Sequence, residues 1–199
     1  NHMVVLPDAD LDLAADAAIN AGFGSAGERC MAISALVAVG GIGDDLVARI
    51  AERTHTLRTG DGRKGADMGP LISKRHRDRV ESYVEAGEKE GAKLVAGGAE
   101  APEGLERGYF VRPTVFSEVT PEMTIAQEEI FGPVLSVIPY DDDEDAIRIA
   151  NDTPYGLSGA VYTSSFERGW AIANRIRSGM IHINDQTIAD FAHIPMGGM

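Results

Sequence analysis

The stretch Ile33-Ser-Ala-Leu-Val-Ala-Val39 indicates the fold most directly, because it is an apolar run of the length of one strand. A strand with one wet face alternates apolar and polar residues, whereas a strand covered on both faces is apolar throughout. We therefore expect residues 33–39 to form an inner strand of a parallel sheet. Helices on both faces of that sheet would provide the cover.

Further strand-like and helix-like segments alternate along the rest of the chain. We expect Asp8 to cap a helix that starts near Ala9 and breaks at residues 22–27. The other expected strands are residues 3–6, 93–96, 110–116, 134–140, 157–162 and 180–183. The other expected helices are residues 44–55, 74–90, 143–150 and 166–177. The alternation predicts an α/β fold with a mostly parallel sheet covered by helices on both faces.

Length and composition fit one globular domain. The chain has 199 residues, 44% of them hydrophobic, and 18 Lys and Arg against 31 Asp and Glu give a net charge of -13. This acidity argues against nucleic acid and anionic membranes as partners. No apolar run approaches the roughly 18 residues of a membrane span. The single cysteine excludes an internal disulfide, which suits a reducing cytoplasm, so we expect a cytoplasmic protein.

Cys30 is the leading candidate for a catalytic residue. It follows small residues in Gly24-Ser-Ala-Gly-Glu-Arg-Cys30, which would allow a substrate to approach the backbone closely. A thiolate is a strong nucleophile when it is exposed, and the adjacent Arg29 would favour the charged form. The alternative interpretation is a buried, inert cysteine that packs as a small hydrophobe.

Two other patterns are poor candidates for sites. Gly22-Phe-Gly24-Ser-Ala-Gly27 matches the dinucleotide fingerprint G-x-G-x-x-G, but that motif must follow a strand and open a helix, and here it follows a helix-like stretch. The acidic run Asp141-Asp-Asp-Glu-Asp145 suits a helix N-terminus better than a cation site. His182 fits a strand, and with no cysteine near it we expect no metal site.

Six segments together resemble the aldehyde dehydrogenase superfamily. The cysteine segment resembles that family's G-E-x-C motif, and Glu128-Glu-Ile-Phe-Gly-Pro-Val134 matches E-E-I-F-G-P-V without change. The other four are Met68-Gly-Pro-Leu-Ile-Ser73, Gly108-Tyr-Phe-Val-Arg-Pro-Thr-Val-Phe116, Asn151-Asp-Thr-Pro-Tyr-Gly-Leu-Ser158 and Pro195-Met-Gly-Gly-Met199. Their order and spacing also agree with the family, and they extend over nearly the whole chain.

The resemblance implies a fold, a chemistry and three site residues. Residues 1–199 would be the catalytic domain of the aldehyde dehydrogenase fold, and Cys30 would attack an aldehyde and carry a thiohemiacetal and then a thioester. Glu129 would accept hydrogen bonds from the ribose of NAD or NADP, and Phe131 would pack beside the nicotinamide. From the residues alone, Glu129 is a solvated loop carboxylate and Phe131 a core side chain.

The resemblance also implies what lies outside the chain. The nucleotide-binding domain, the oxyanion-stabilising asparagine and the general base would precede Asn1, so we expect little or no dehydrogenase activity from residues 1–199 alone. The full-length protein would be a homo-oligomer that acts on a small-molecule aldehyde.

The two halves of the chain resemble different members of the family. Residues 1–10 and 28–34 resemble methylmalonate-semialdehyde dehydrogenases, which pass the acyl group to coenzyme A. Residues 179–187 with Ala192 and His193 resemble benzaldehyde or vanillin dehydrogenases, which hydrolyse the thioester. We expect hydrolysis, with a CoA-acylating enzyme or a non-catalytic truncated domain as the alternatives. A different thiol enzyme, such as an acyltransferase or hydrolase, is disfavoured because it needs no nicotinamide motif.

Overall fold

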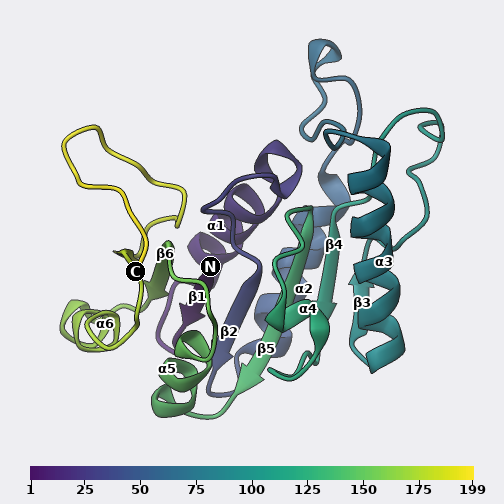
Figure 1. The fold of residues 1–199 in the computed structure, drawn as a ribbon. Coiled ribbons are helices and arrows are strands. Elements are labelled where there is room, and N and C mark those ends of the chain that lie inside the picture. Colours follow the sequence, from purple (N-terminus) through teal and green to yellow (C-terminus); the bar gives the residue numbers. More distant parts are fainter.

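The apolar run predicted as a strand at residues 33–39 forms an inner strand of a seven-stranded sheet, although the strand begins at Ala35 rather than at Ile33. The computed structural model describes residues 1–199, and all five residues of this strand, β2, are buried. The sheet has the order β3-β4-β5-β2-β1-β6-β7, and only the β3–β4 pair is antiparallel (Figure 1). The strands are β1 (His2–Val5), β2 (Ala35–Val39), β3 (Lys93–Ala96), β4 (Thr114–Ser117), β5 (Val134–Tyr140), β6 (Ser158–Tyr162) and β7 (Met180–Ile183).

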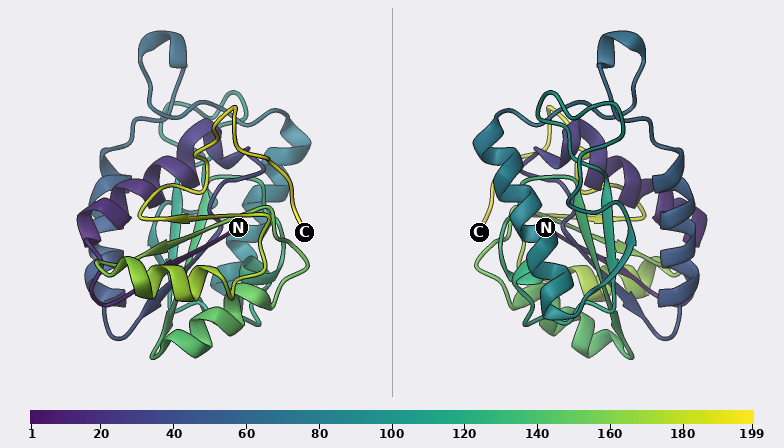
Figure 2. Two further views of the ribbon diagram at one scale, coloured as in Figure 1. Left: turned by 90° about the vertical axis from the view of Figure 1, so that its left-hand side faces the viewer. Right: turned by 90° about the vertical axis from the view of Figure 1, so that its right-hand side faces the viewer.

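Helices cover both faces of this sheet. The helices are α1 (Leu11–Phe23), α2 (Gly43–Thr56), α3 (Lys74–Glu90), α4 (Thr124–Gln127), α5 (Asp143–Asn151) and α6 (Phe166–Ala173), with short 3-10 turns at Gly24–Gly27 and Gly62–Lys64. The helices α1 and α2 pack on each other on one face, and α3 lies on the other (Figure 2). The chain runs across the sheet from β1 through β2 to β3 at one edge, and then back from β3 to β7 at the other edge. Because crossovers between parallel strands are right-handed, this reversal puts α5 and α6 on the face opposite α1.

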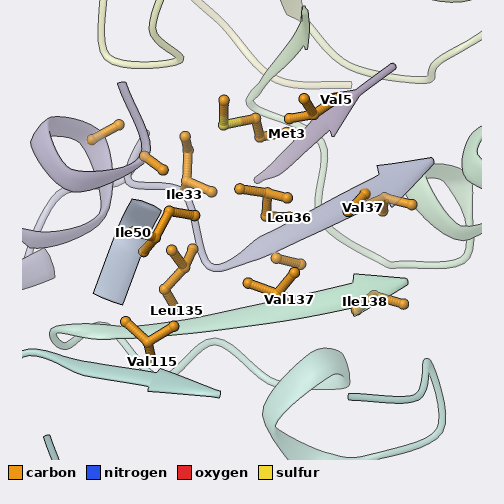
Figure 3. Close-up of a cluster of buried hydrophobic side chains, with 14 of the residues drawn as sticks. Met3, Val5, Ile33, Leu36, Val37, Ile50, Val115, Leu135, Val137 and Ile138 are labelled. Carbon is orange, nitrogen blue, oxygen red and sulfur yellow. The ribbon is translucent and has the colours of Figure 1, made fainter. Parts of the chain in front are cut away.

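The core lies where these helices meet the inner strands. Leu36 of β2 and Ile50 of α2 have no exposed surface, and they gather with Met3 and Leu135 in one apolar cluster (Figure 3). Burying a side chain of this size contributes roughly 1.5–3 kcal/mol. The inner strands are thereby held from both sides, and the loops at their ends are fixed relative to one another.

The first helix begins later than predicted. Its N-cap is Asp10, whose carboxylate accepts hydrogen bonds from the N–H groups of Asp12 and Leu13, so the prediction of Asp8 as the cap was wrong. The carboxylate of Asp8 instead accepts hydrogen bonds from Thr163 and Ser164, which follow the neighbouring strand β6. The capping residue was misidentified because both aspartates precede the helix and only the tertiary contacts distinguish them.

Two other predicted boundaries also move for local reasons. Strand β4 begins at Thr114 rather than at Phe110, because Pro113 has no N–H to donate to the neighbouring strand. Helix α6 ends at Ala173 rather than at Arg177, because Asn174 bonds its side chain to the Trp170 carbonyl and competes with the backbone. Helix α4, which carries the chain into the Glu128–Val134 segment, has four residues and was not predicted.

Candidate active site

A pocket opens at the amino edge of the parallel strands, where the loops that lead into β1, β2, β5 and β6 meet. Its lining includes Asn1, Cys30, Glu129, Phe131 and Tyr155. The sequence motifs around Cys30 and Glu129 are about 100 residues apart in the chain, yet the sheet order places β2 beside β5 and brings them together. All three predicted site residues, Cys30, Glu129 and Phe131, line this one pocket.

The loop that carries Cys30 is held by its carbonyl groups. The Asn1 side-chain amide donates to the carbonyls of Cys30 (2.7 Å) and Ala32 (2.9 Å), and the Thr187 hydroxyl donates to the Met31 carbonyl (2.7 Å). Asn1 is itself fixed, because its Oδ1 accepts a hydrogen bond from the Ser158 N–H (2.9 Å). Three consecutive carbonyls are thus fixed by side chains from other parts of the chain.

In the same loop, the thiol and the backbone N–H of Cys30 have no such partners. Cys30 is exposed, so the alternative of a buried, inert cysteine was wrong. The Cys30 N–H donates to no acceptor in the chain. An unpaired N–H beside a nucleophile is the group that stabilises an oxyanion as it forms on a carbonyl substrate.

Arg29 lies beside Cys30 in sequence, but its guanidinium group turns back toward the end of α1. Its Nε donates to the Ser25 hydroxyl (3.1 Å), and its guanidinium lies against Gly24 so closely that a Cβ there would be 2.8 Å from it. The fingerprint-like glycines follow helix α1 and precede strand β2, which is the context that argues against a phosphate cradle.

The two glutamates at the start of the Glu128–Val134 segment have different surroundings. Glu128 accepts a hydrogen bond from the Tyr83 hydroxyl of α3 (2.5 Å). The Glu129 carboxylate has no hydrogen-bond or ion-pair partner in the chain, and Arg79 binds only its backbone carbonyl (3.2 Å). Glu129 is therefore the one whose oxygens are free to accept hydrogen bonds from a ligand in the pocket.

The Phe131 backbone and the neighbouring glycines show that the two loops of the pocket fit closely. Phe131 adopts a left-handed backbone with φ of 57°, which is uncommon for a residue other than glycine. Gly27 lies against Gly132, and a Cβ on Gly27 would be 2.2 Å from the Gly132 carbonyl oxygen. Only glycine allows this approach of the thiol loop to the Glu129 loop.

At the carboxyl edge of the sheet, several acidic residues are paired with neighbouring groups. Asp8 accepts hydrogen bonds from the Thr163 hydroxyl (2.8 Å) and from the Ser164 N–H and hydroxyl (3.1 and 2.7 Å). These bonds, Ser164 first, lower the pKa of the Asp8 carboxyl to about 2. Arg168 forms two bonds to Asp143 (2.9 and 2.7 Å), and Asp142 caps α5.

No group of three or more His, Cys, Asp or Glu side chains is placed to hold a metal ion. His182 lies in β7, as predicted, and burial lowers the pKa of its imidazole.

Comparison with known proteins places these features in a family. A family model described as "Aldehyde dehydrogenase family" matches residues 1–199. The chain belongs to the aldehyde dehydrogenase family. This confirms the resemblance drawn from the six sequence segments.

Relatives in the aldehyde dehydrogenase family match the whole chain. The chain is 45% identical over 199 residues to malonate-semialdehyde dehydrogenase 3 of Geobacillus kaustophilus, covering 100% of this chain and 41% of that protein. It is 45% identical over 201 residues to betaine aldehyde dehydrogenase of Bacillus subtilis, again covering 100% of this chain and 41% of the relative. The chain thus spans 41% of the length of these curated relatives.

A solved aldehyde dehydrogenase confirms the predicted fold class. The crystal structure of Mycobacterium tuberculosis aldehyde dehydrogenase complexed with NAD+ superposes with a TM-score of 0.95 at 43% identity, covering 100% of this chain and 41% of that one. The malonate-semialdehyde relative also matches residues 179–193, the part that resembles benzaldehyde-type members. None of the helices is both long and apolar enough to cross a membrane.

Three residues in or next to this pocket were not recognised as site residues from the sequence. Asn1 and Thr187 hold the thiol loop, and Tyr155 lines the pocket with Cys30. Nothing in the local sequence distinguishes Thr187. Asn1 and Thr187 act on residues about 30 and 156 positions away, so only the fold reveals them.

Proposed function

We propose that residues 1–199 form the catalytic domain of an NAD-dependent aldehyde dehydrogenase in which Cys30 is the nucleophile. The observation that carries the proposal is one pocket with an exposed thiol, an unpaired Cys30 N–H and an unpaired Glu129 carboxylate. A thiol acting alone as a hydrolase nucleophile would not need the free carboxylate or the Phe131 turn. The nucleotide-binding domain would lie outside these residues.

The proposed reaction begins at Cys30. Its thiolate sulfur bonds to the aldehyde carbon, and the carbonyl electron pair moves to oxygen, where the Cys30 N–H stabilises the new charge. The fixed carbonyls of residues 30–32 hold the loop that carries that N–H. The acyl group then remains on sulfur as a thioester. Attack by water breaks the carbon–sulfur bond, releases a carboxylic acid and restores the thiol.

The pocket residues fit the nicotinamide end of NAD. The free Glu129 carboxylate suits the ribose hydroxyls, which are hydrogen-bond donors, and half-buried Phe131 offers an apolar side chain beside it. NAD, when bound, supplies the acceptor for the hydride that must leave the aldehyde carbon, because protein side chains supply none. The similar Mycobacterium tuberculosis structure was solved with NAD+.

The proposal includes a cellular setting. We expect a cytoplasmic enzyme that acts on a small-molecule aldehyde as a homo-oligomer. The single cysteine supports a reducing compartment, and the acidic net charge of -13 favours small-molecule partners over nucleic acid.

The decisive experiment is aldehyde oxidation by the full gene product. With an aldehyde and NAD, we expect NADH to form and mass spectrometry of a quenched sample to show an acyl group on Cys30. The product with and without coenzyme A separates the two fates: free acid supports hydrolysis, and acyl-CoA would replace it with acyl transfer. Absence of both NADH and the acyl adduct with a panel of aldehydes would leave a non-catalytic domain.

The role of Glu129 has a matched pair of variants. Glu129→Gln weakens acceptance of two ribose hydrogen bonds, so we expect the KM for NAD to rise about tenfold, the effect of one hydrogen bond to a charged group. Glu128→Gln is the control, because Glu128 is held by Tyr83 and leaves the pocket carboxylate unchanged. Equal effects of the two variants would contradict the assignment.

A further inference from the structure

His76 lies at the N-terminal turn of α3, between the two loops that build the pocket. Its Nε2 is 2.6 Å from the Phe131 carbonyl oxygen and 3.4 Å from Glu28 Oε1. Its ring also meets the Phe131 ring edge-on, with centroids 6.3 Å apart. The side chains of His76 and Glu28 are both 16% exposed, so this bridge is largely shielded from water.

The Phe131 contact determines which form of the imidazole is present. A carbonyl oxygen only accepts, so the His76 Nε2 carries the hydrogen and donates it to Phe131. Phe131 is the residue whose backbone is left-handed, and such a conformation persists when its surroundings hold it. The His76 bond pins the carbonyl of that strained residue, directly after Glu129 and Ile130.

The Glu28 contact reaches the other loop. Glu28 lies two residues before Cys30, and its carboxylate also accepts a hydrogen bond from the Ile72 N–H (3.2 Å), just ahead of α3. The thiol loop is thus tied to the same helix end that holds Phe131. The close approach of Gly27 to Gly132 shows independently that the backbones of the two loops pack directly against each other.

We propose that His76 is a positioning residue that couples the thiol loop to the Glu129 loop, because its Nε2 contacts both the Phe131 carbonyl and the Glu28 carboxylate. His76 does not line the pocket, so it acts through these two partners. Its importance for turnover rests on the proposed dehydrogenase function, but the coupling itself is a property of the fold.

Two substitutions separate the hydrogen bond from the ring. His76→Gln keeps a donor near the Nε2 position and removes the ring, whereas His76→Phe keeps the ring contact and removes the donor. Arg75→Gln is the matched control, because Arg75 is exposed and makes no hydrogen bond or ion pair. Circular dichroism and thermal unfolding establish that each variant is folded.

Hydrogen exchange measures the coupling without any turnover. The reporters are Val134 N–H, bonded to the Gly132 carbonyl (2.8 Å), and Ala32 N–H, bonded to the Arg29 carbonyl (3.1 Å). In His76→Phe we expect exchange of both amides to rise about tenfold, as for one lost hydrogen bond, and His76→Gln to restore both to within about twofold. The alkylation rate of Cys30 by iodoacetamide, followed by mass spectrometry of the peptide that contains Cys30, should change about threefold with the Phe variant alone.

The outcomes are distinct. Faster exchange at Val134 alone would reduce His76 to a local support of the Phe131 turn and overturn the coupling. Gln behaving like Phe would overturn the role of the donor. If His76→Phe does not fold, Glu28→Gln tests the same bridge from the thiol loop and should speed exchange at Ala32 and Val134 alike. If the wild-type protein oxidises no aldehyde but the coupling appears, the proposed function fails and the bridge stands.

Discussion

The two edges of the sheet use polar groups in opposite ways. At the carboxyl edge, Asp8 takes three hydrogen bonds from Thr163 and Ser164, and Arg168 joins Asp143. At the amino edge, the Cys30 N–H and the Glu129 carboxylate have no partner in the chain. Open α/β sheets usually bind ligands at the carboxyl ends of their strands. Here Asp8 and Asp143 of that edge are paired with neighbouring groups, and the unpaired Cys30 N–H and Glu129 carboxylate lie at the other end.

The contrast shows how a candidate active site can keep unpaired polar groups for a ligand while its backbone is held in place. The amino edge fixes the carbonyls of residues 30–32 with the side chains of Asn1 and Thr187, and leaves the Cys30 N–H just before them without a partner. The carboxyl edge satisfies its donors and acceptors mutually. Substitutions should therefore affect reactivity at one edge and stability at the other.

The largest expected effect is on the amino edge. In the full gene product, Cys30→Ser should lower aldehyde oxidation by about 10³-fold or more, as loss of a nucleophile does. The free energy of unfolding should change by less than about 0.5 kcal/mol, because the side chain is exposed. Steady-state rates and urea unfolding measure the two. If Cys30→Ser oxidises aldehyde at the wild-type rate, the proposal that the amino edge carries the reactive groups is wrong.

The next effect belongs to the carboxyl edge. Asp8→Ala removes three hydrogen bonds from Thr163 and Ser164 and a longer one from Arg168 (3.4 Å), and should cost about 2 kcal/mol, after allowance for its partial exposure to solvent. The alkylation rate of Cys30 should stay unchanged. The control is Asp141→Ala, which removes an exposed aspartate of the same edge that makes no hydrogen bond. A change in Cys30 alkylation would show that the two edges are not independent.

A substitution of Thr187 should change both the free energy of unfolding and the reactivity of Cys30, each by a smaller amount. Thr187→Val keeps the shape but leaves the Met31 carbonyl without its donor, which costs about 1 kcal/mol. Because that carbonyl belongs to the thiol loop, Cys30 alkylation should change about threefold. Thr59→Val, where the hydroxyl makes no hydrogen bond, is the control for loss of a hydroxyl. Loss of stability with an unchanged alkylation rate would make Thr187 a purely structural residue.

The smallest effect is a pH dependence that also starts at Asp8. Its folded pKa of about 2 lies below its usual value of 3.8, so its stabilisation is complete above about pH 4 and is lost as the pH falls through 2. The difference in unfolding free energy between wild type and Asp8→Asn should therefore shrink from pH 5 to pH 2. A difference that stays constant over this range would mean that the network does not depend on the charge.

Much of the fold could be predicted from local sequence patterns. The bounds of α3, β3, β5 and β7 agree with the prediction, because each has a clear apolar period and flanking turn residues. The prediction that Asp8 rather than Asp10 caps the first helix was wrong, because an aspartate that caps a helix and one that binds a neighbouring loop look alike in sequence. The fate of Asp8 depended on Thr163 and Ser164, more than 150 residues away.

The site was predicted in part for the same reason. Cys30, Glu129 and Phe131 lie in recognisable segments, and the fold places all three in one pocket. Asn1, Thr187 and His76 have no local signal, because each acts by reaching a backbone group of a distant loop. Residues that line the pocket lie in recognisable sequence motifs, whereas residues that position those side chains are found only from their contacts in the structure.

The side chain of Asn1 has a consequence for how the protein folds. It joins the start of β1 to the loop before β2, and also to the Ser158 N–H, 157 residues along the chain. The reactive loop therefore cannot take its final form while the chain is still being synthesised through β5. Contacts of such long sequence separation slow folding. Cys30 becomes properly presented only when β6 has joined β1, so its reactivity marks a late stage of assembly.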